Sequence, residues 1–380
     1  MNYQYTTGRR VSNWVLLLSF AFVISSCSNK EGSGKSTSGP LTVDLTESKA
    51  KNELQTRIVD IMPISLPEAF PGFSQRLRLK KYENRYFVFD QESQQLLCVD
   101  FNGKFRFSVG GLGGGPNELQ SATDFTYADG LVSFLISSGN ASTIVKFDTL
   151  GTKISSTDIA YYITSFIQTG PDEYLLYTGW TYQQTPYRLF NYNLRSGEDT
   201  AFMKHQYPEE KMGMEAYALA SYKEQTVFFD PMTPYIYEIN SSLEVDTLIK
   251  LNLGDFEMGE EYWEKPANEA MQDLMTHGFY ACRFLYRTDN YLAMLGNFTD
   301  FGENIQDVTF SIYDFEDDKV STAILEPGTR DELLFTVFGF ENNQMVSLGD
   351  GYVLKEASLD PDRFDLVEDQ YYLVLSEVDL

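Results

Sequence analysis

One pattern recurs along the chain and restricts the fold more than any other. Pairs of short strand-like runs follow one another, and the second run of each pair ends in Asp or Asn. These endings are Asp100, Asp148, Asn193, Asn240 and Asp314, at intervals of 48, 45, 47 and 74 residues. A period in the mid-forties built of short strands is typical of a β-propeller. One four-stranded blade cannot bury both of its faces, so blades stack around a ring and cover each other.

The clearest copy of the pattern lies within residues 98–119, which read CVDFNGKFRFSVGGLGGGPNEL. Asn102-Gly103 between alternating apolar residues predicts a tight turn between two strands. The second strand, over 104–109, leads into a glycine-rich loop at 110–115, which Pro116-Asn117-Glu118 closes. We interpret this stretch as a blade hairpin followed by the crossover to the next blade.

The pattern predicts an all-β fold, a six-bladed β-propeller of four-stranded antiparallel blades. Five blades are expected between about residues 82 and 325. The sixth is expected to combine C-terminal strands within 333–378, one of them over 351–355, with an N-terminal strand near 55–66. Such a splice closes the ring non-covalently and protects both termini. Because the repeats are degenerate, seven blades are the alternative.

The long fourth interval requires an insertion. Residues 257–276 are rich in helix formers, and Ala267, Ala270, Met271, Leu274 and Met275 lie near helical spacing. Pro266 suits a helix start. We therefore predict one inserted helix near 257–276, outside the sheets and packed on one face of the disc.

The N-terminus is typical of a targeting segment. Arg9 and Arg10 precede a mostly apolar run over 11–24, which is too short for a spanning helix and fits a signal sequence. No later segment is long and apolar enough to span a membrane. We predict a signal peptide over 1–26, a flexible Gly/Ser-rich tether over 27–40 and the propeller over 41–380.

Charge and cysteine content restrict partners and redox chemistry. The formal net charge of −26 argues against nucleic acid or an anionic membrane surface as partner, since both require a basic patch. Cys98 and Cys282 lie in apolar, strand-like surroundings, which favours two buried single thiols, although a disulfide between them stays open.

Three features together resemble one family, the six-bladed, NHL-like β-propeller lipoproteins of Bacteroides and relatives, whose function is unknown. The features are the lipobox-like quartet Ile24-Ser25-Ser26-Cys27, the hairpin at 100–105 (DFNGKF) and the run at 113–118 (GGGPNE). Asn117 stands where the family usually has glycine, and its "I-P-L" strand is only loosely matched by Ile64-Ser65-Leu66 after Pro63. The resemblance implies lipidation of Cys27, an outer-membrane location facing the periplasm or the cell surface, and no established chemistry. The alternative for Cys27 is an ordinary cleaved signal in which the cysteine is incidental.

The glycine-rich loop is better explained by structure than by a nucleotide. A phosphate-binding loop would end in Gly-Lys-Ser/Thr, and a dinucleotide loop would have a glycine where Pro116 stands. We expect a wide inter-blade loop with φ > 0 at several glycines. Glu118 is expected to accept backbone N–H bonds there. The structural residues of this loop are Gly113, Gly114, Gly115, Pro116 and Glu118.

No catalytic residue, metal site or cofactor is predicted. His205 and His277 are the only histidines, which disfavours a multi-histidine metal site, and both are expected at the surface. Acidic clusters are plentiful, but no spacing singles out the carboxylate pair that glycoside hydrolysis requires.

Two weaker kinds of site are predicted. Trp180, Tyr182 and Tyr187 cluster in a polar loop and suit a sugar or a peptide, but capping of the core between blades is the favoured alternative. Thr149 and Thr247 each follow Asp and precede Leu, which matches the short O-glycosylation sequon of Bacteroides. Thr149 lies at an expected turn and is the better candidate.

These features favour a lipid-anchored extracytoplasmic propeller that acts as a non-enzymatic binding or scaffold module. Its partners would be the membrane, through the anchor at Cys27, and a glycan, a peptide or an outer-membrane protein. The alternative is a carbohydrate-active enzyme, a glycoside hydrolase or lyase, that uses carboxylates at the propeller channel.

Overall fold

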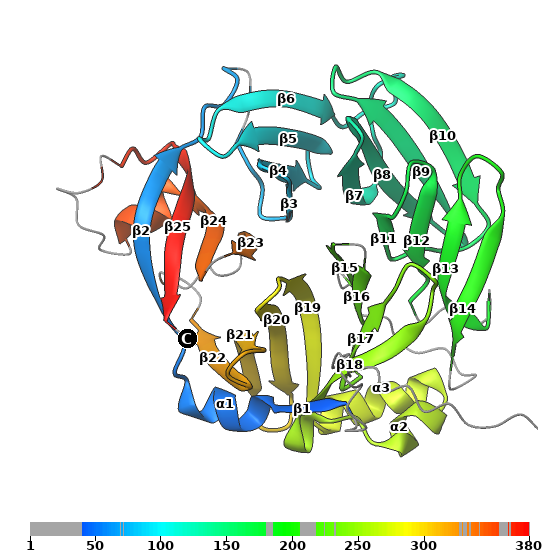
Figure 1. The fold of residues 1–380 in the computed structure, drawn as a ribbon, viewed down its shortest axis with the longest axis vertical. Helices are drawn as coiled ribbons and strands as arrows, with labels where there is room; N and C mark the ends of the chain where they lie inside the picture. The colour runs from blue at the N-terminus through cyan, green and yellow to red at the C-terminus, as the bar shows by residue number, and fades with distance from the viewer. Residues whose placement is uncertain are drawn as a thin grey trace, which may run out of the picture. The chain divides into compact units, whose positions relative to one another are not determined.

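Six sheets arranged in a ring make up the described part of the chain (Figure 1). The structure, a computed structural model, describes residues 40–379 except 69, 71, 180–184, 206–217, 224, 232, 327, 328, 330–332, 334, 335, 342, 357–363 and 365. These residues belong to one unit, Pro40–Leu380. The prediction of an all-β propeller with six blades is confirmed, and the seven-bladed alternative is wrong.

Blades I to III each contain four antiparallel strands that follow one another along the chain. Blade I consists of β3 (Leu77–Tyr82), β4 (Arg85–Asp90), β5 (Gln95–Asp100) and β6 (Phe105–Gly110). Blade II consists of β7 (Ala122–Ala128), β8 (Leu131–Ser138), β9 (Ala141–Asp148) and β10 (Lys153–Ile159). Blade III consists of β11 (Ser165–Gln168), β12 (Glu173–Tyr177), β13 (Tyr187–Asn193) and β14 (Asp199–Lys204).

Blades IV and VI each include a strand from the N-terminal part of the body, whereas blade V consists of four consecutive strands. Blade IV consists of β15 (Leu219–Tyr222), β16 (Gln225–Phe229), β17 (Tyr235–Ile239) and β18 (Val245–Asn252), with β1 (Leu41–Asp44) added at its edge. Blade V consists of β19 (Phe279–Arg287), β20 (Tyr291–Asp300), β21 (Ile305–Asp314) and β22 (Lys319–Leu325). Blade VI consists of β23 (Val337–Glu341), β24 (Gln344–Asp350), β25 (Tyr371–Asp379) and β2 (Gln55–Pro63).

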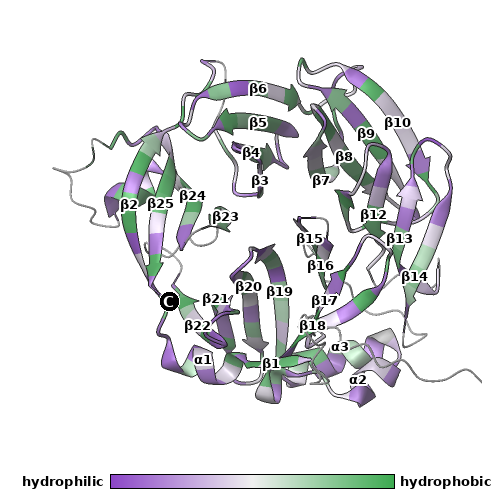
Figure 2. Ribbon diagram, in the orientation of Figure 1, coloured by the Kyte–Doolittle hydropathy of each residue, from purple (hydrophilic) through white to green (hydrophobic). Residues whose placement is uncertain are grey.

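Burial explains why these runs form strands. The second strands of blades I and III are buried at every residue after the first, because both of their faces lie against neighbouring blades. The outermost β10 is mostly exposed. Hydrophobic residues recur along the strands of all six blades (Figure 2). Between blades I and II, for example, Phe87 and Phe89 pack with Phe125 and Phe134.

The Asp and Asn residues of the repeat share one structural role. Each ends, or directly follows, the third strand of its blade, and its side-chain oxygen accepts backbone N–H bonds from the turn that follows. Asp148 Oδ1, for example, accepts from the N–H groups of Leu150 and Thr152 at 3.0 and 2.8 Å. Asp100, Asn193, Asn240 and Asp314 make the equivalent bonds. The repeat is therefore a set of Asx turns, for which Asp and Asn are equally suited.

The ring closes as expected, through pairing of the N-terminal β2 with the C-terminal β25. Their register runs from Gln55 opposite Asp379 to Pro63 opposite Tyr372. The strand predicted over 351–355 is wrong, because β24 ends at Asp350 and helix α5 (Gly351–Glu356) follows. Asp350 Oδ1 accepts the Tyr352 N–H at 2.7 Å, which starts the helix. A Cβ at Gly351 would lie 2.0 Å from the Val367 carbonyl oxygen, so only glycine fits there.

An N-terminal belt, residues 41–63, runs along the outer edges of three blades, which the sequence did not reveal. Strand β1 pairs in parallel with β18, and helix α1 (Leu45–Lys51) then lies against β22 (Figure 1). Ser48 Oγ donates to the Val320 carbonyl at 3.1 Å, and the Ile324 N–H donates to Asn52 Oδ1 at 2.8 Å. Strand β2 follows and enters blade VI. One segment therefore joins the rims of blades IV, V and VI.

The predicted insertion between blades IV and V is helical but interrupted. It contains the 3₁₀ turn η1 (Gly254–Phe256), α2 (Glu260–Glu264) and α3 (Ala267–Thr276). Pro266 caps α3, and Lys265 before it is extended because a residue preceding proline avoids the helical region. Tyr262, Trp263 and Leu274 pack with Phe279 at the start of β19.

Cys98 in β5 and Cys282 in β19 are buried free thiols in separate cores, so they form no disulfide. Burial raises the pKa of each thiol to about 12. Among the described residues, no helix combines the length and apolarity needed to cross a membrane.

Candidate functional site

The inner strands of five blades surround a cavity of about 320 Å³ in the central channel. Its wall is mainly apolar, and each contributing blade supplies at least one hydrophobic side chain. These side chains are Leu77 and Leu79 from blade I, Ile167 from blade III, Leu219 from blade IV, Phe284, Leu285 and Leu295 from blade V, and Val337 and Phe338 from blade VI. A concave apolar space of this size lies at the lower end of the range for small-molecule sites.

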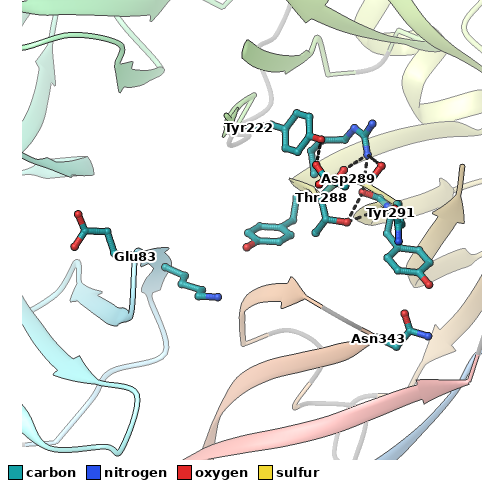
Figure 3. A pocket seen from close by; sticks show the side chains of 10 residues that line it. Glu83, Tyr222, Thr288, Asp289, Tyr291 and Asn343 are labelled. Carbon is teal, nitrogen blue, oxygen red and sulfur yellow. Dashed lines mark hydrogen bonds between the residues drawn. The ribbon is translucent and has the colours of Figure 1, made fainter. Parts of the chain in front are cut away.

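A polar pocket of about 390 Å³ adjoins this cavity and shares Lys81 and Tyr286 with it. We call this pocket the channel mouth. It is lined by the turns that join the first and second strands of blades I, V and VI, and by the end of β15 in blade IV. Figure 3 shows Glu83 on one side, Tyr222, Thr288, Asp289 and Tyr291 on another, and Asn343 near the third turn.

Asp289 is held at the mouth by two neighbouring side chains. The Tyr222 hydroxyl donates to Asp289 Oδ1, and Lys223 Nζ lies 2.5 Å from the same oxygen. These bonds from Lys223 and Tyr222 lower the pKa of the Asp289 carboxyl. The bond to Asp289 in turn raises the pKa of Lys223. Asp289 is therefore a carboxylate that stays ionised, and it lacks the raised pKa of a general acid.

Arg287 fixes the turn that carries Asp289. Its Nη1 donates to the carbonyl of Thr288, and to those of Asp289 and Tyr291 at 3.2 and 3.3 Å. The guanidinium carbon lies 4.7 Å from the Tyr222 ring centre and 3.8 Å from that of Phe315. Burial lowers the pKa of Arg287. Its contacts are with the protein itself, so its role at the mouth is structural.

The aromatic ligand site predicted at Trp180, Tyr182 and Tyr187 stays a prediction. Trp180 and Tyr182 lie outside the described residues. Tyr187 begins β13 and packs, half-buried, against the core between blades II and III. It is not among the residues that line the channel or its mouth.

The modification sites stay predictions. Cys27 lies outside the described residues. Thr149 is half-buried in the turn between β9 and β10, while Thr247 is exposed on β18 opposite Tyr237.

The glycine-rich loop carries no charged group suited to a phosphate and is held by its own side chains. Glu118 Oε2 accepts the Gly115 N–H at 2.6 Å. A Cβ at Gly113 would lie 1.9 Å from the same carboxylate oxygen, and one at Gly115 would lie 2.9 Å from it. Positive φ occurs at Gly110 and Gly111, and not at the three glycines that follow. Gly113 and Gly115 therefore leave room for Glu118, and the expected φ > 0 is found only at Gly110 and Gly111.

The histidines differ from the expectation in one respect. His277 caps the C-terminus of α3 and is exposed, as expected. His205 is instead buried at the end of blade III, where burial and the nearby Arg188 lower its pKa to about 4. No group of three or more His, Cys, Asp or Glu side chains within the described residues is arranged to hold a metal ion.

Sequence reasoning missed the residues of the channel mouth. Glu83, Tyr222, Asp289 and Asn343 are far apart along the chain and belong to short polar turns. The one usable signal was the position of each turn between the first and second strands of a blade. In a propeller these turns meet at the same end of the channel.

Comparison with known proteins gives a family and a fold. The family model described as "Domain of unknown function (DUF4934)" matches residues 73–360. No curated protein matches the chain. A solved structure of a Bacteroides fragilis protein described as exported is similar at a TM-score of 0.69 and 12% identity, covering 90% of this chain and 99% of that one. A Bacteroides vulgatus member of the DUF4221 family is similar at 0.54 and 10%, with 86% and 99% covered.

Proposed function

The chain belongs to the DUF4934 family, and from its own geometry we propose that it is a non-enzymatic extracytoplasmic binding module that takes its ligand in the central channel. The observation that carries this proposal is the amphipathic channel, in which an apolar wall from five blades lies beside a polar mouth. The apolar part of a ligand would be removed from water against the apolar wall, while its polar part would contact the charged and aromatic groups of the mouth.

The cellular location of the protein is part of the same proposal. The apolar run over 11–24 and Cys27 directly after Ser25-Ser26 support export and acylation, which would place the propeller on a short tether at the outer membrane. Mass spectrometry of the native protein should then show acyl chains on Cys27 that a Cys27→Ser variant lacks, and an unmodified Cys27 in the wild type would contradict the anchor.

Binding in the channel can be tested by blocking it. Ser221 is exposed on β15 and lines the cavity, so Ser221→Trp should fill the space, whereas Ser221→Ala should leave it open. A ligand that binds only the folded state raises its stability by about 2.7 kcal/mol at 100 times its Kd. We expect thermal-shift screening of glycans, peptides and apolar acids, alcohols and amines to yield ligands that stabilise the wild type and S221A but not S221W. Stabilisation that S221W retains for every ligand would contradict the channel site.

A second candidate function, a carbohydrate-active enzyme, is supported by one observation. Glu83 and Asp289 both line the mouth, together with Tyr222, Tyr286 and Tyr291, and paired carboxylates with aromatic walls suit a sugar. The bonds from Tyr222 and Lys223, which keep Asp289 ionised, weigh against an acid role for this residue. If the protein turns over a glycan, and Glu83→Gln or Asp289→Asn abolishes that turnover, the protein is an enzyme and the proposal of a binding module is wrong.

A further inference from the structure

The channel and its mouth are lined by more basic than acidic residues, whereas the chain as a whole is acidic. The protein has 29 Lys and Arg against 55 Asp and Glu. The side chains that line the two adjoining cavities include four basic residues and only two acidic ones. The basic residues are Lys80, Lys81, Arg283 and Arg287, and the acidic ones are Glu83 and Asp289. Clefts with low-dielectric walls focus such charges, so this one attracts anions.

Several of these charges are already engaged with the protein. Lys80 Nζ lies 2.7 Å from Asp124 Oδ1 of blade II, Arg287 binds carbonyls of its own turn, and Asp289 is paired with Lys223. Arg283 differs from them. Within the part of the chain that the structure describes, its guanidinium has no hydrogen bond or ion pair, and its side chain is exposed in the channel.

A β-bulge places Arg283 there. Cys282 pairs with Gly296, and Phe284 pairs with Leu295, so Arg283 is the extra residue on β19. A bulge redirects the side chain of its unpaired residue, and bulges are enriched next to binding sites. Arg283 precedes Arg287 by four residues, which places it about 13 Å along the strand from the mouth. The cation therefore lies inside the channel.

The wall of the cavity that Arg283 lines is mainly apolar. Leu79, Phe284 and Phe338 line the same cavity as the guanidinium. The volume of 320 Å³ has room for roughly ten water-sized or methylene-sized groups of about 30 Å³ each. A guanidinium in such a site binds a carboxylate through two parallel hydrogen bonds, and the apolar wall takes an apolar chain.

We propose that the channel binds a small anionic amphiphile, whose single carboxylate pairs with Arg283 and whose unbranched apolar chain of roughly ten carbons lies along the apolar wall. This assignment rests on the proposed function, since it names the ligand class of the same channel. It is carried by the bulge that aims Arg283 into the cavity and by the reversed charge of the lining.

The test compares three ligands of equal chain length, namely decanoate, 1-decanol and decyltrimethylammonium, by isothermal titration calorimetry below their micelle concentrations. The protein is the predicted mature chain, residues 27–380, with Cys27→Ser, which lacks both the apolar run over 11–24 and the predicted acylation site and so needs no detergent. The variants are Arg283→Gln, the channel block Ser221→Trp, and Lys319→Gln, which removes a positive charge from the outermost strand of the same blade.

We expect decanoate to bind about tenfold or more tightly than decanol, because a hydrogen bond to a charged group contributes that much. This preference should disappear in R283Q and persist in K319Q, and S221W should abolish all binding. If decanol binds as tightly as decanoate, or if R283Q still binds decanoate more tightly than decanol, the proposed pairing of a carboxylate with Arg283 is wrong. If decanol binds in that case and S221W abolishes its binding, the channel is still the binding site of the proposed function, but it does not select an anionic ligand. Preferred binding of the ammonium ligand, or no binding of decanoate, also overturns the inference.

Discussion

Asp230, which has no exposed surface, joins blade IV to blade III through two side chains. The Tyr177 hydroxyl donates to its Oδ1 at 2.6 Å, and Arg188 Nη1 donates to its Oδ2. Burial lowers the pKa of Arg188, but Asp230 and the neighbouring tyrosines raise it more, so the guanidinium stays charged. A buried charge of this kind requires its partner, because desolvation of an unpaired ion is costly.

Replacing Asp230 by Asn should therefore leave the Arg188 charge without a counter-charge in a buried site. We expect Asp230→Asn to lower the free energy of unfolding by about 3–5 kcal/mol, measured by urea denaturation. The matched control is Glu377→Gln, which removes the carboxylate of the exposed pair with Arg57 and should have little effect. Equal losses in the two variants would contradict the role of burial.

Asp100 provides a pH test. Burial raises the pKa of its carboxyl, but the N–H groups of Lys104 and Asn102 and the charge of Arg106 lower it more, so the pKa lies below its usual value. A lowered folded-state pKa stabilises the protein above the unfolded pKa of about 3.9, and this contribution is lost as the pH falls through the folded value.

The matched variant is Asp100→Asn, because Asn193 and Asn240 form the same Asx turn in blades III and IV. This variant keeps the turn and removes only the charge. We expect the wild type to be more stable than D100N at pH 6, and the difference to begin to shrink near pH 4 and to shrink further as the pH falls through the lowered folded-state pKa. A difference that stays constant from pH 6 to pH 3 in urea unfolding would contradict the assignment.

At the scale of elements, two turns of blade I depend on glycine for different reasons, the β5–β6 turn at Gly103 and the β6–β7 loop at Gly113. At Gly103, φ is +73° and a Cβ would lie 2.4 Å from the Pro63 carbonyl oxygen, which cannot move away. At Gly113 the obstacle is the flexible carboxylate of Glu118. The sequence predicted both turns. Only the contacts in the structure show that an added Cβ would meet backbone at Gly103 and a side chain at Gly113.

This difference predicts a coupling. We expect Gly113→Ala to displace Glu118 and lose its bond to the Gly115 N–H, at a cost of about 1 kcal/mol in the free energy of unfolding. In the Glu118→Ala background the same substitution should be neutral or slightly stabilising. A double-mutant cycle by urea unfolding measures the coupling. Additive effects would contradict it, and Gly103→Ala should remain costly in both backgrounds.

At the scale of the whole molecule, the ring depends on one seam between segments that are far apart in sequence. Arg57 on β2 and Glu377 on β25 lie opposite each other, 320 residues apart, and their side chains form an ion pair. The belt strengthens this seam, since β1 and α1 add contacts to blades IV and V before the chain enters blade VI.

A disulfide across the seam should stabilise the ring. We expect Arg57→Cys with Glu377→Cys to form a disulfide and to raise Tm, because closing so long a loop removes roughly 5 kcal/mol of chain entropy from the unfolded state. Reduction should return Tm to near the wild-type value, and Glu377→Cys alone should not respond. An unchanged Tm in the oxidised double variant would contradict closure through this pair.

The sequence by itself determined the blade period, favoured six blades over seven and indicated the strand that closes the ring. These features depend on local chemistry, namely alternating apolar residues and an Asp or Asn that accepts turn N–H bonds. It also indicated the helical insertion, although the break at Pro266 and the helix after Asp350 required the observed backbone.

Only the tertiary structure decided which residues meet. Glu83, Tyr222, Asp289 and Asn343 share the channel mouth because the ring brings the first turn of several blades to one end. Arg283 enters the channel because a bulge shifts the register of β19, and β1 joins blade IV by parallel pairing. Such contacts depend on the lateral order of blades and on strand register, which local periodicity in a single sequence does not encode.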